Sequence, residues 1–263
     1  MEIYLKTNEE IELLRESSLL VSKTLAELAK VIKPGISTLY LDKIAEEFIR
    51  DNGASPAFKG YNGFPASICT SINEQVVHGI PSDKVFLKDG DIISIDCGTY
   101  KNGFVGDSAY TFCVGNVSDE VKCLLETTKE SLFEGIKYAV EGNRIGDIGY
   151  AVQSYCEKAG YSVVREMVGH GVGRTMHESP EVPNYGRRGM GKMLREGMTI
   201  CIEPMINMGR KELVFESDGW TTRTKDRKCS AHFEHAVAIR KGYADVLSDF
   251  DIIEQVLKQQ NNN

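Results

Sequence analysis

The 263-residue chain lacks the features that mark several large classes of protein. It has no run of about 18 apolar residues, the length that a membrane-spanning helix needs. Its first ten residues, MEIYLKTNEE, have neither the basic start nor the apolar segment of a secretory signal. We therefore expect a cytoplasmic protein without a membrane partner.

Basic charge and paired cysteines are also scarce. The chain carries 31 Lys and Arg against 38 Asp and Glu, a net charge of −7. A nucleic-acid-binding domain usually shows a basic excess, so we expect no specific nucleic-acid site. The seven cysteines are odd in number and none has CxxC spacing, which argues against a disulfide framework and a zinc finger.

The chain does contain an internal repeat. The stretch LKDGDIISID at 87–96 resembles LREGMTICIE at 194–203, at an offset of 107 residues. The same offset relates two helix-terminating glycines, Gly53 and Gly160. This period is too long for a solenoid. Chance similarity of a common helix–helix–strand–strand pattern is the alternative, but the match runs through two separated segments without a gap.

The repeat predicts an α+β protein with two similar halves, at about 7–115 and 118–242. No linker separates the halves, so we expect a single domain, 1–263, with one shared core and a tail at 248–263 without assigned function. Helical spacing and stop signals predict helices at about 7–33, 37–51, 118–139 and 146–158. Strands are expected at about 66–72, 92–99, 104–114, 162–168, 199–206 and 231–240.

Four acids occupy related positions in the two halves: Asp96, Asp107, Glu203 and Glu234. Their strand neighbours are mostly Ile and Val, so these carboxylates are expected to be largely buried. Unpaired buried charges are costly and need a partner. No Arg or Lys recurs beside them, and four acids are too many for one shared proton. A pair of divalent metal ions fits best.

Three of the five histidines lie in short Gly-rich loops, at His78, His170 and His177, and any of them could add an imidazole. The other two, His232 and His235, flank Glu234. By strand alternation His235 points away from the acid, whereas His232 shares its face and is not excluded as a group behind the ligands. Oxygen ligands with about one imidazole suit Mn(II), Fe(II), Co(II) or catalytic Zn.

With these residues identified, the chain resembles the type 1 methionine aminopeptidases over about residues 7–245. The motifs that carry the resemblance, in order, are SINE at 71–74, His78-Gly79, SID at 94–96, GDS at 106–108, GHGVGR at 169–174, His177-Glu178, Glu203-Pro204, DGW at 218–220 and Glu234-His235. The resemblance implies the pita-bread (creatinase/aminopeptidase) fold, with two pseudo-symmetric αα-ββ halves around a mostly antiparallel, curved sheet. It also implies a metal-ligand set of Asp96, Asp107, His170, Glu203 and Glu234.

The resemblance implies a chemistry as well. An aminopeptidase of this family removes the N-terminal methionine of nascent proteins with a small second residue, through attack by a metal-bound hydroxide. Glu203 would carry the proton, His177 would stabilise the oxyanion and His78 would bond the scissile nitrogen. The free amine would sit on one metal. Nothing in the sequence demands more than a monomer, and nascent-chain substrates would suggest docking on the ribosome.

The implied substrate pocket is apolar and soft. Its residues would be Phe58, Tyr61, Phe64, Cys69, His78, Met176, His177 and Trp220, the last being the sole tryptophan. Phe58 and Met176 depart from the residues common in the family and are expected to alter pocket shape rather than the reaction. The resemblance also implies a monovalent cation held by backbone carbonyls near Asn73–Gln75 and Ser230.

Three alternatives belong to the same fold. An Xaa-Pro aminopeptidase or prolidase usually has a large extra N-terminal domain, and this chain begins its first helix at about residue 7. A type 2 methionine enzyme carries a helical insertion, for which the 25 residues between His177 and Glu203 leave no room. A metal-free binding module would have lost ligands, and all five ligand positions are intact here.

Overall fold

Two pairs of helices and a single C-terminal helix are present in this computed structural model, which describes residues 3–261. The first pair is α1 (Asn8–Ala29) and α2 (Thr38–Asp51), and the second is α3 (Asp119–Ile136) and α4 (Ile145–Lys158). A capping box opens α1, with Thr7 and Glu10 each accepting the other's backbone N–H. The tail, whose last two residues lie outside the described part, forms α5 (Asp251–Asn261).

The strands form four small antiparallel sheets. One has the order β1-β4-β2, with β5 also paired to β4; the others have the orders β15-β14-β9-β7-β8, β13-β10-β6 and β11-β12-β3. The strand bounds are β1 Ser55–Pro56, β2 Ile68–Ile72, β3 Gln75–Val77, β4 Ile92–Lys101, β5 Phe104–Cys113, β6 Ser162–Val163, β7 Gly169–Gly171, β8 Glu178–Val182, β9 Thr199–Ile202, β10 Met205–Asn207, β11 Leu213–Phe215, β12 Thr222–Thr224, β13 Ser230–His232, β14 His235–Ile239 and β15 Ala244–Val246.

The second half is less regular than the sequence pattern predicted. The expected strand at 199–206 is divided into β9 and β10, because Pro204 has no N–H to donate to a ladder. The expected strand at 231–240 is divided at Phe233–Glu234, and the one at 162–168 is reduced to the two residues of β6. Each of the first two breaks places an acid, Glu203 or Glu234, where regular pairing stops.

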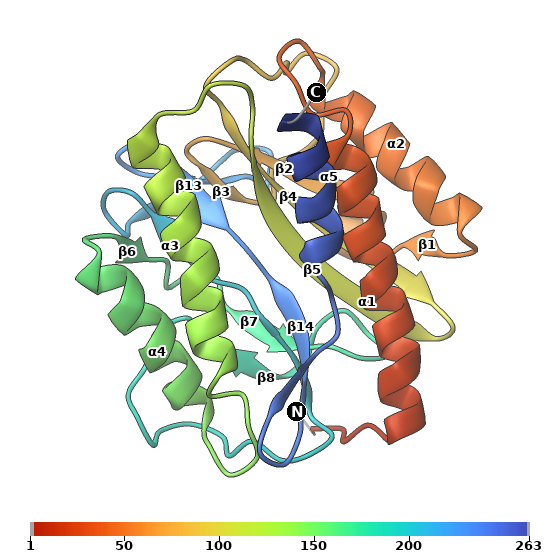
Figure 1. Ribbon diagram of the computed structural model, residues 1–263, viewed down its shortest axis with the longest axis vertical. Coiled ribbons are helices and arrows are strands. Elements are labelled where there is room, and N and C mark those ends of the chain that lie inside the picture. Colours follow the sequence, from red (N-terminus) through yellow and green to blue (C-terminus); the bar gives the residue numbers. More distant parts are fainter. Residues whose placement is uncertain (1–2, 262–263) are drawn as a thin grey trace.

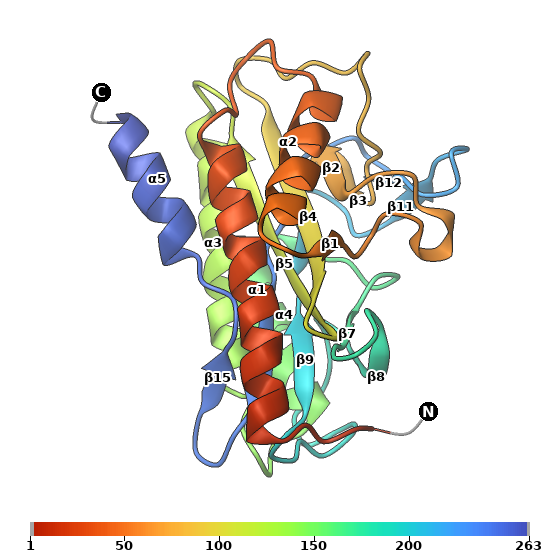
Figure 2. The same ribbon diagram turned by 90° about the vertical axis from the view of Figure 1, so that its right-hand side faces the viewer.

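The helices cover one face of the strands, and the loops that carry most of the predicted pocket lie on the other (Figures 1 and 2). α1 lies directly against β5: a Cβ added to Gly106 would come within 2.4 Å of the Ser17 carbonyl carbon. The Ser17 hydroxyl accepts the Gly106 N–H at 3.0 Å. Small residues on both elements therefore permit a close helix–strand approach.

The two halves are joined at the acids. The Glu234 N–H donates to the Ala109 carbonyl at 2.9 Å, and the Ser108 hydroxyl donates to the Glu234 carbonyl at 2.6 Å. These two hydrogen bonds hold Glu234 of the second half against β5, the strand that carries Asp107 of the first half. No helix within residues 3–261 is long and apolar enough to cross a lipid bilayer.

Candidate metal centre

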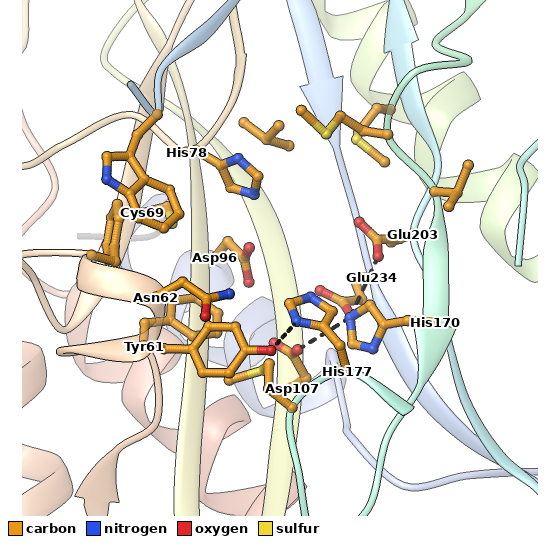
Figure 3. A pocket seen from close by; sticks show the side chains of 18 residues that line it. Tyr61, Asn62, Cys69, His78, Asp96, Asp107, His170, His177, Glu203 and Glu234 are labelled. Atoms are coloured by element: carbon orange, nitrogen blue, oxygen red, sulfur yellow. Dashed lines mark hydrogen bonds and ion pairs between the residues drawn. The ribbon is translucent and has the colours of Figure 1, made fainter. Parts of the chain in front are cut away.

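The four predicted acids converge because of strand register. On the paired strands β4 and β5, Asp107 lies opposite Gly98, two residues beyond Asp96, so both side chains project from the same face. In the second half, His235 pairs with Ile202, which brings the adjacent residues Glu203 and Glu234 together. Figure 3 shows the four carboxylates around one space.

His170 is the histidine that joins the acids. Its Nε2 lies 3.7 Å from Asp107 Oδ2 and 3.7 Å from Glu203 Oε1. Its Nδ1–H donates to the Gly171 carbonyl at 2.9 Å, which leaves the Nε2 lone pair facing the carboxylates. The flanking glycines are required by packing, since a Cβ on Gly169 would lie 2.3 Å from the Cys201 carbonyl oxygen.

Burial dominates the electrostatics of this cluster. Loss of solvation raises the pKa of Asp96 to about 7 and the pKa of Glu203 to about 8. The pKa values of Asp107 and Glu234 are raised well above the usual range, first by burial and then by the neighbouring acids. Burial also lowers the pKa of His170 to about 3, so the imidazole is neutral and able to coordinate.

The residues fit a divalent metal. Three buried carboxylate oxygens, Asp96 Oδ1, Asp107 Oδ1 and Glu234 Oε1, have no hydrogen-bond partner in the described part of the chain. Among residues 3–261, no Lys or Arg lines the cavity into which the acids project. Uncompensated buried oxygens beside a neutral imidazole have the chemistry of a divalent-metal site.

Cys201 is a neighbour that the sequence did not indicate. Its Sγ lies with ligand atoms of Asp107, His170 and Glu234 in a group that spans no more than 4.8 Å. The residue is fully buried on β9, and burial raises the pKa of its thiol well above the usual value.

An apolar cavity of about 290 Å³ opens onto the acids. The structure places all eight residues of the predicted pocket in its wall. Five wall residues escaped prediction: Asn62, Val77, Met167, Val168 and Met205. Asn62 adopts a left-handed φ of +48°, and Met205 follows the Glu203-Pro204 motif by one residue, but neither feature is distinctive in a sequence.

Aromatic and sulfur-containing side chains shape the wall. Trp220 meets Phe64 edge to face, with ring centroids 5.1 Å apart. Phe58 and Met176 meet above Gly98, where an added Cβ would lie 2.6 Å from the Phe58 ring and 3.0 Å from the Met176 methyl. Cys69 is buried, and burial raises the pKa of its thiol well above normal, so it is unreactive.

Two further histidines face the cavity. The Tyr61 hydroxyl bonds His177 Nδ1 at 2.8 Å, across the mouth of the cavity (Figure 3). If Tyr61 is the donor, His177 carries its own proton on Nε2. His78 has a left-handed φ of +60°, an uncommon conformation for a residue other than glycine. Burial lowers the pKa of His78 to about 4, so this ring is neutral.

Contacts of the neighbouring residue, Glu178, hold the loop that carries His177 in place. Glu178 accepts the Arg174 N–H at 2.9 Å and pairs with Lys6, whose side chain is nearly buried. The segments expected to hold a monovalent cation also meet, since the Ser230 N–H donates to the Asn73 carbonyl at 2.8 Å.

Comparison with known proteins agrees with this arrangement. The profile of metallopeptidase family M24 matches residues 12–241. "Methionine aminopeptidase 1" of Bacillus subtilis is 52% identical over 246 residues, covering 94% of this chain and 99% of the relative. The crystal structure of methionine aminopeptidase from Rickettsia prowazekii superposes with a TM-score of 0.93 at 41% identity, covering 94% of this chain and all of that one.

The proline-directed branch is more distant. The prolidase from Pyrococcus furiosus superposes with a TM-score of 0.74 at 25% identity, and this chain covers 65% of it. The expected pita-bread fold is confirmed by the family match and by these neighbours. The chain therefore belongs to metallopeptidase family M24, as a methionine aminopeptidase.

Proposed function

We propose that this enzyme releases the N-terminal methionine from peptides and nascent proteins whose second residue is small. Two divalent ions would be held by Asp96, Asp107, His170, Glu203 and Glu234. The observation that carries the proposal is the floor of the cavity, where buried, unpartnered carboxylate oxygens meet a neutral imidazole beneath an aromatic and sulfur-lined wall. When bound, such ions polarise a peptide carbonyl and supply a nucleophilic water at neutral pH.

The cavity would select methionine through its shape and its polarizable aromatic and sulfur-containing wall. The unbranched thioether would enter between Trp220, Phe64 and Met176, where sulfur and aromatic groups make favourable contacts. The terminal amine would lie against the acidic floor. An internal peptide bond has an amide at that place and loses this interaction, which restricts cleavage to the first residue.

The reaction is hydrolysis, and the protein side chains move its proton. Water adds to the carbonyl carbon while the Glu203 carboxylate accepts a proton as the general base. His177 Nε2–H donates a hydrogen bond to the developing oxyanion and keeps its proton. Glu203 returns the proton to the leaving nitrogen, which neutral His78 positions, and the C–N bond breaks to give methionine and the shortened peptide.

The same proposal describes the enzyme as a cytoplasmic monomer that acts on chains emerging from the ribosome. A binding module without metals would require lost ligands, and the five side chains are all in place around the cavity. Proline-directed activity remains a separate outcome that a direct assay distinguishes.

The deciding assay uses chelator-treated protein reconstituted with Mn(II), Fe(II), Co(II) or Zn(II), and the peptides Met-Ala-Ser and Ala-Pro-Ser. We expect metal-dependent release of methionine from the first peptide alone, and the rates will rank the metals. Cleavage of the second peptide alone would transfer the chain to the proline-directed activity. Folded protein that cleaves neither peptide with any metal would overturn the proposal.

A further inference from the structure

His232 is a buried imidazole that the proposed reaction does not use. It lies on β13 with 1% of its surface exposed, and its Nε2 has no hydrogen-bond partner among the residues that the structure describes. Buried polar atoms are nearly always satisfied, so an unpartnered one beside a metal centre requires an explanation.

The His232 ring faces the proton-carrying acid. Its Nε2 lies 3.5 Å from Glu203 Oε2, while His170 Nε2 lies 3.7 Å from Glu203 Oε1. The Glu203 carboxylate thus stands between two imidazoles, one for each oxygen. Figure 3 shows the His170 side of this arrangement.

Hydrogen bonds with Thr111 and pairing with β10 fix the backbone of His232. Its N–H donates to the Thr111 hydroxyl at 3.0 Å, and that hydroxyl donates to the His232 carbonyl at 2.7 Å. His232 also pairs with Met205 on β10. A ring on so fixed a backbone has a defined position, and a small rotation of the Glu203 carboxylate would bring Oε2 into hydrogen-bond range.

The position differs between the halves. Two residues before its second acid, Asp107, the first half has the buried apolar Val105, whereas the second half has His232 before Glu234. The imidazole therefore accompanies the half whose first acid, Glu203, must both bind metal and carry a proton.

We propose that His232 is a positioning residue for Glu203: its Nε2–H would donate to Oε2 and hold the carboxylate so that Oε1 stays directed toward His170, its fellow candidate ligand. The proposal rests on the proposed metal centre. With metal bound, the carboxylates are ionised and the Nε2–H tautomer is the favourable one, because an Nε2 lone pair would be repelled by Glu203 Oε2. Direct coordination is not inferred, since His232 is outside both the cavity wall and the tight group of ligand atoms among the described residues.

The first test is metal affinity, measured by calorimetry with Mn(II) and Co(II) on chelator-treated protein. His232→Gln keeps a donor at nearly the place of Nε2, and His232→Met keeps the length without a donor. We expect His232→Met to weaken metal binding by about 10- to 100-fold, the usual effect of removing a partner of a ligand. His232→Gln should retain most of the affinity. Equal affinities of His232→Met and the unaltered protein would overturn the proposal.

His235→Met is the matched control. His235 is also fully buried beside Glu234, but it bonds the Ser248 hydroxyl at 2.6 Å and stacks on Phe250, away from the acids. We expect this variant to lose thermal stability and to bind metal normally once folded. Weakened binding in this control equal to that of His232→Met would assign the effect to general loosening and overturn the role of His232.

Two spectroscopic measurements do not depend on turnover. Nitrogen NMR of the unaltered protein loaded with diamagnetic Zn(II), in which the carboxylates are ionised, should show His232 protonated at Nε2, and an Nδ1-protonated ring would overturn the proposal even if the variants fail to fold. X-ray absorption of the Co(II) protein should show the same imidazole count in His232→Gln as in the unaltered protein. A lost imidazole would make His232 a ligand instead. Failure of the peptide assay with these results intact would remove the proposed function alone.

Discussion

Each half of this protein brings two acids to the candidate metal centre, but the first half does so with more regular strands than the second. The first half carries its acids on one uninterrupted hairpin, β4 and β5, closed by Asn102-Gly103, both with positive φ. The second half separates Glu203 and Glu234 by 30 residues that include β10 to β13. The acids are duplicated, but the excursion that brings Trp220 to the cavity occurs only in the second half.

The histidines of the cavity are also distributed unequally between the two halves. At the repeat offset of 107, His170 and His177 correspond to Gly63 and Thr70 of the first half. The third cavity histidine, His78, follows β3, which pairs with β12 from the second-half excursion. Regular strands thus position Asp96 and Asp107, whereas Glu203 and Glu234 lie at strand breaks, and His78 and His177 lie outside the strands.

The most severe test of this comparison is to neutralise the proton-carrying acid. We expect Glu203→Gln to reduce methionine release from Met-Ala-Ser by about 10³-fold or more, because general-base catalysis and a metal ligand are lost together. Circular dichroism should show an intact fold. Retention of full activity would remove Glu203 from the mechanism.

The clustering of acids from both halves also predicts how stability depends on pH. In metal-free protein, Asp96 and Glu203 keep protons up to about pH 7 and 8, whereas unfolded carboxyls release them near pH 4. The folded state binds more protons, so stability falls as pH rises from 7 to 8. The buried histidines, whose pKa values are lowered, favour the opposite trend, but only below about pH 6.5.

Thermal unfolding with chelator and with Mn(II), at intervals from pH 7 to 8, checks this trend. Bound metal should remove the decline, because the carboxylates are then ionised and neutralised in the folded state. Glu203→Gln should flatten the decline in the chelated protein by deleting one contributor. A midpoint that rises with pH in chelator would contradict the raised pKa values of the acids.

Regular periodicity explains what the sequence could predict. The helices, the β4–β5 hairpin and the shared face of Asp96 and Asp107 follow from spacing alone. The division of two expected strands could not be predicted from spacing, because continuous apolar runs do not reveal that pairing ends at Pro204 or at Phe233. The residue pattern alone left His78, His170 and His177 open, because their Gly-rich surroundings are similar. The family resemblance selected His170, and in the structure its Nε2 faces Asp107 and Glu203.

The excursion of the second half can be tested through Trp220. Trp220→Ala should reduce the preference for methionine over alanine at the first position by about 10- to 100-fold, since a hydrophobic pocket discriminates by about 1–3 kcal/mol. Metal affinity should stay unchanged, because Trp220 contacts Phe64 and His78 rather than the acids. Loss of metal instead would show that the pocket assignment is wrong.

The smallest expected effect concerns the contact across the cavity between an aromatic residue of the first half and an imidazole of the second. Tyr61→Phe keeps the ring and removes the hydroxyl that bonds His177 Nδ1. One neutral hydrogen bond contributes about 1 kcal/mol, so we expect kcat to fall about five-fold with little change in KM. Nitrogen NMR should show a mixture of His177 tautomers in the variant and mainly the Nε2–H form in the unaltered enzyme. Tyr100→Phe, at an exposed site on β4, is the matched control and should alter neither quantity. If Tyr61→Phe leaves kcat and the tautomer unchanged, the contact only closes the cavity, and the two halves cooperate through their acids alone.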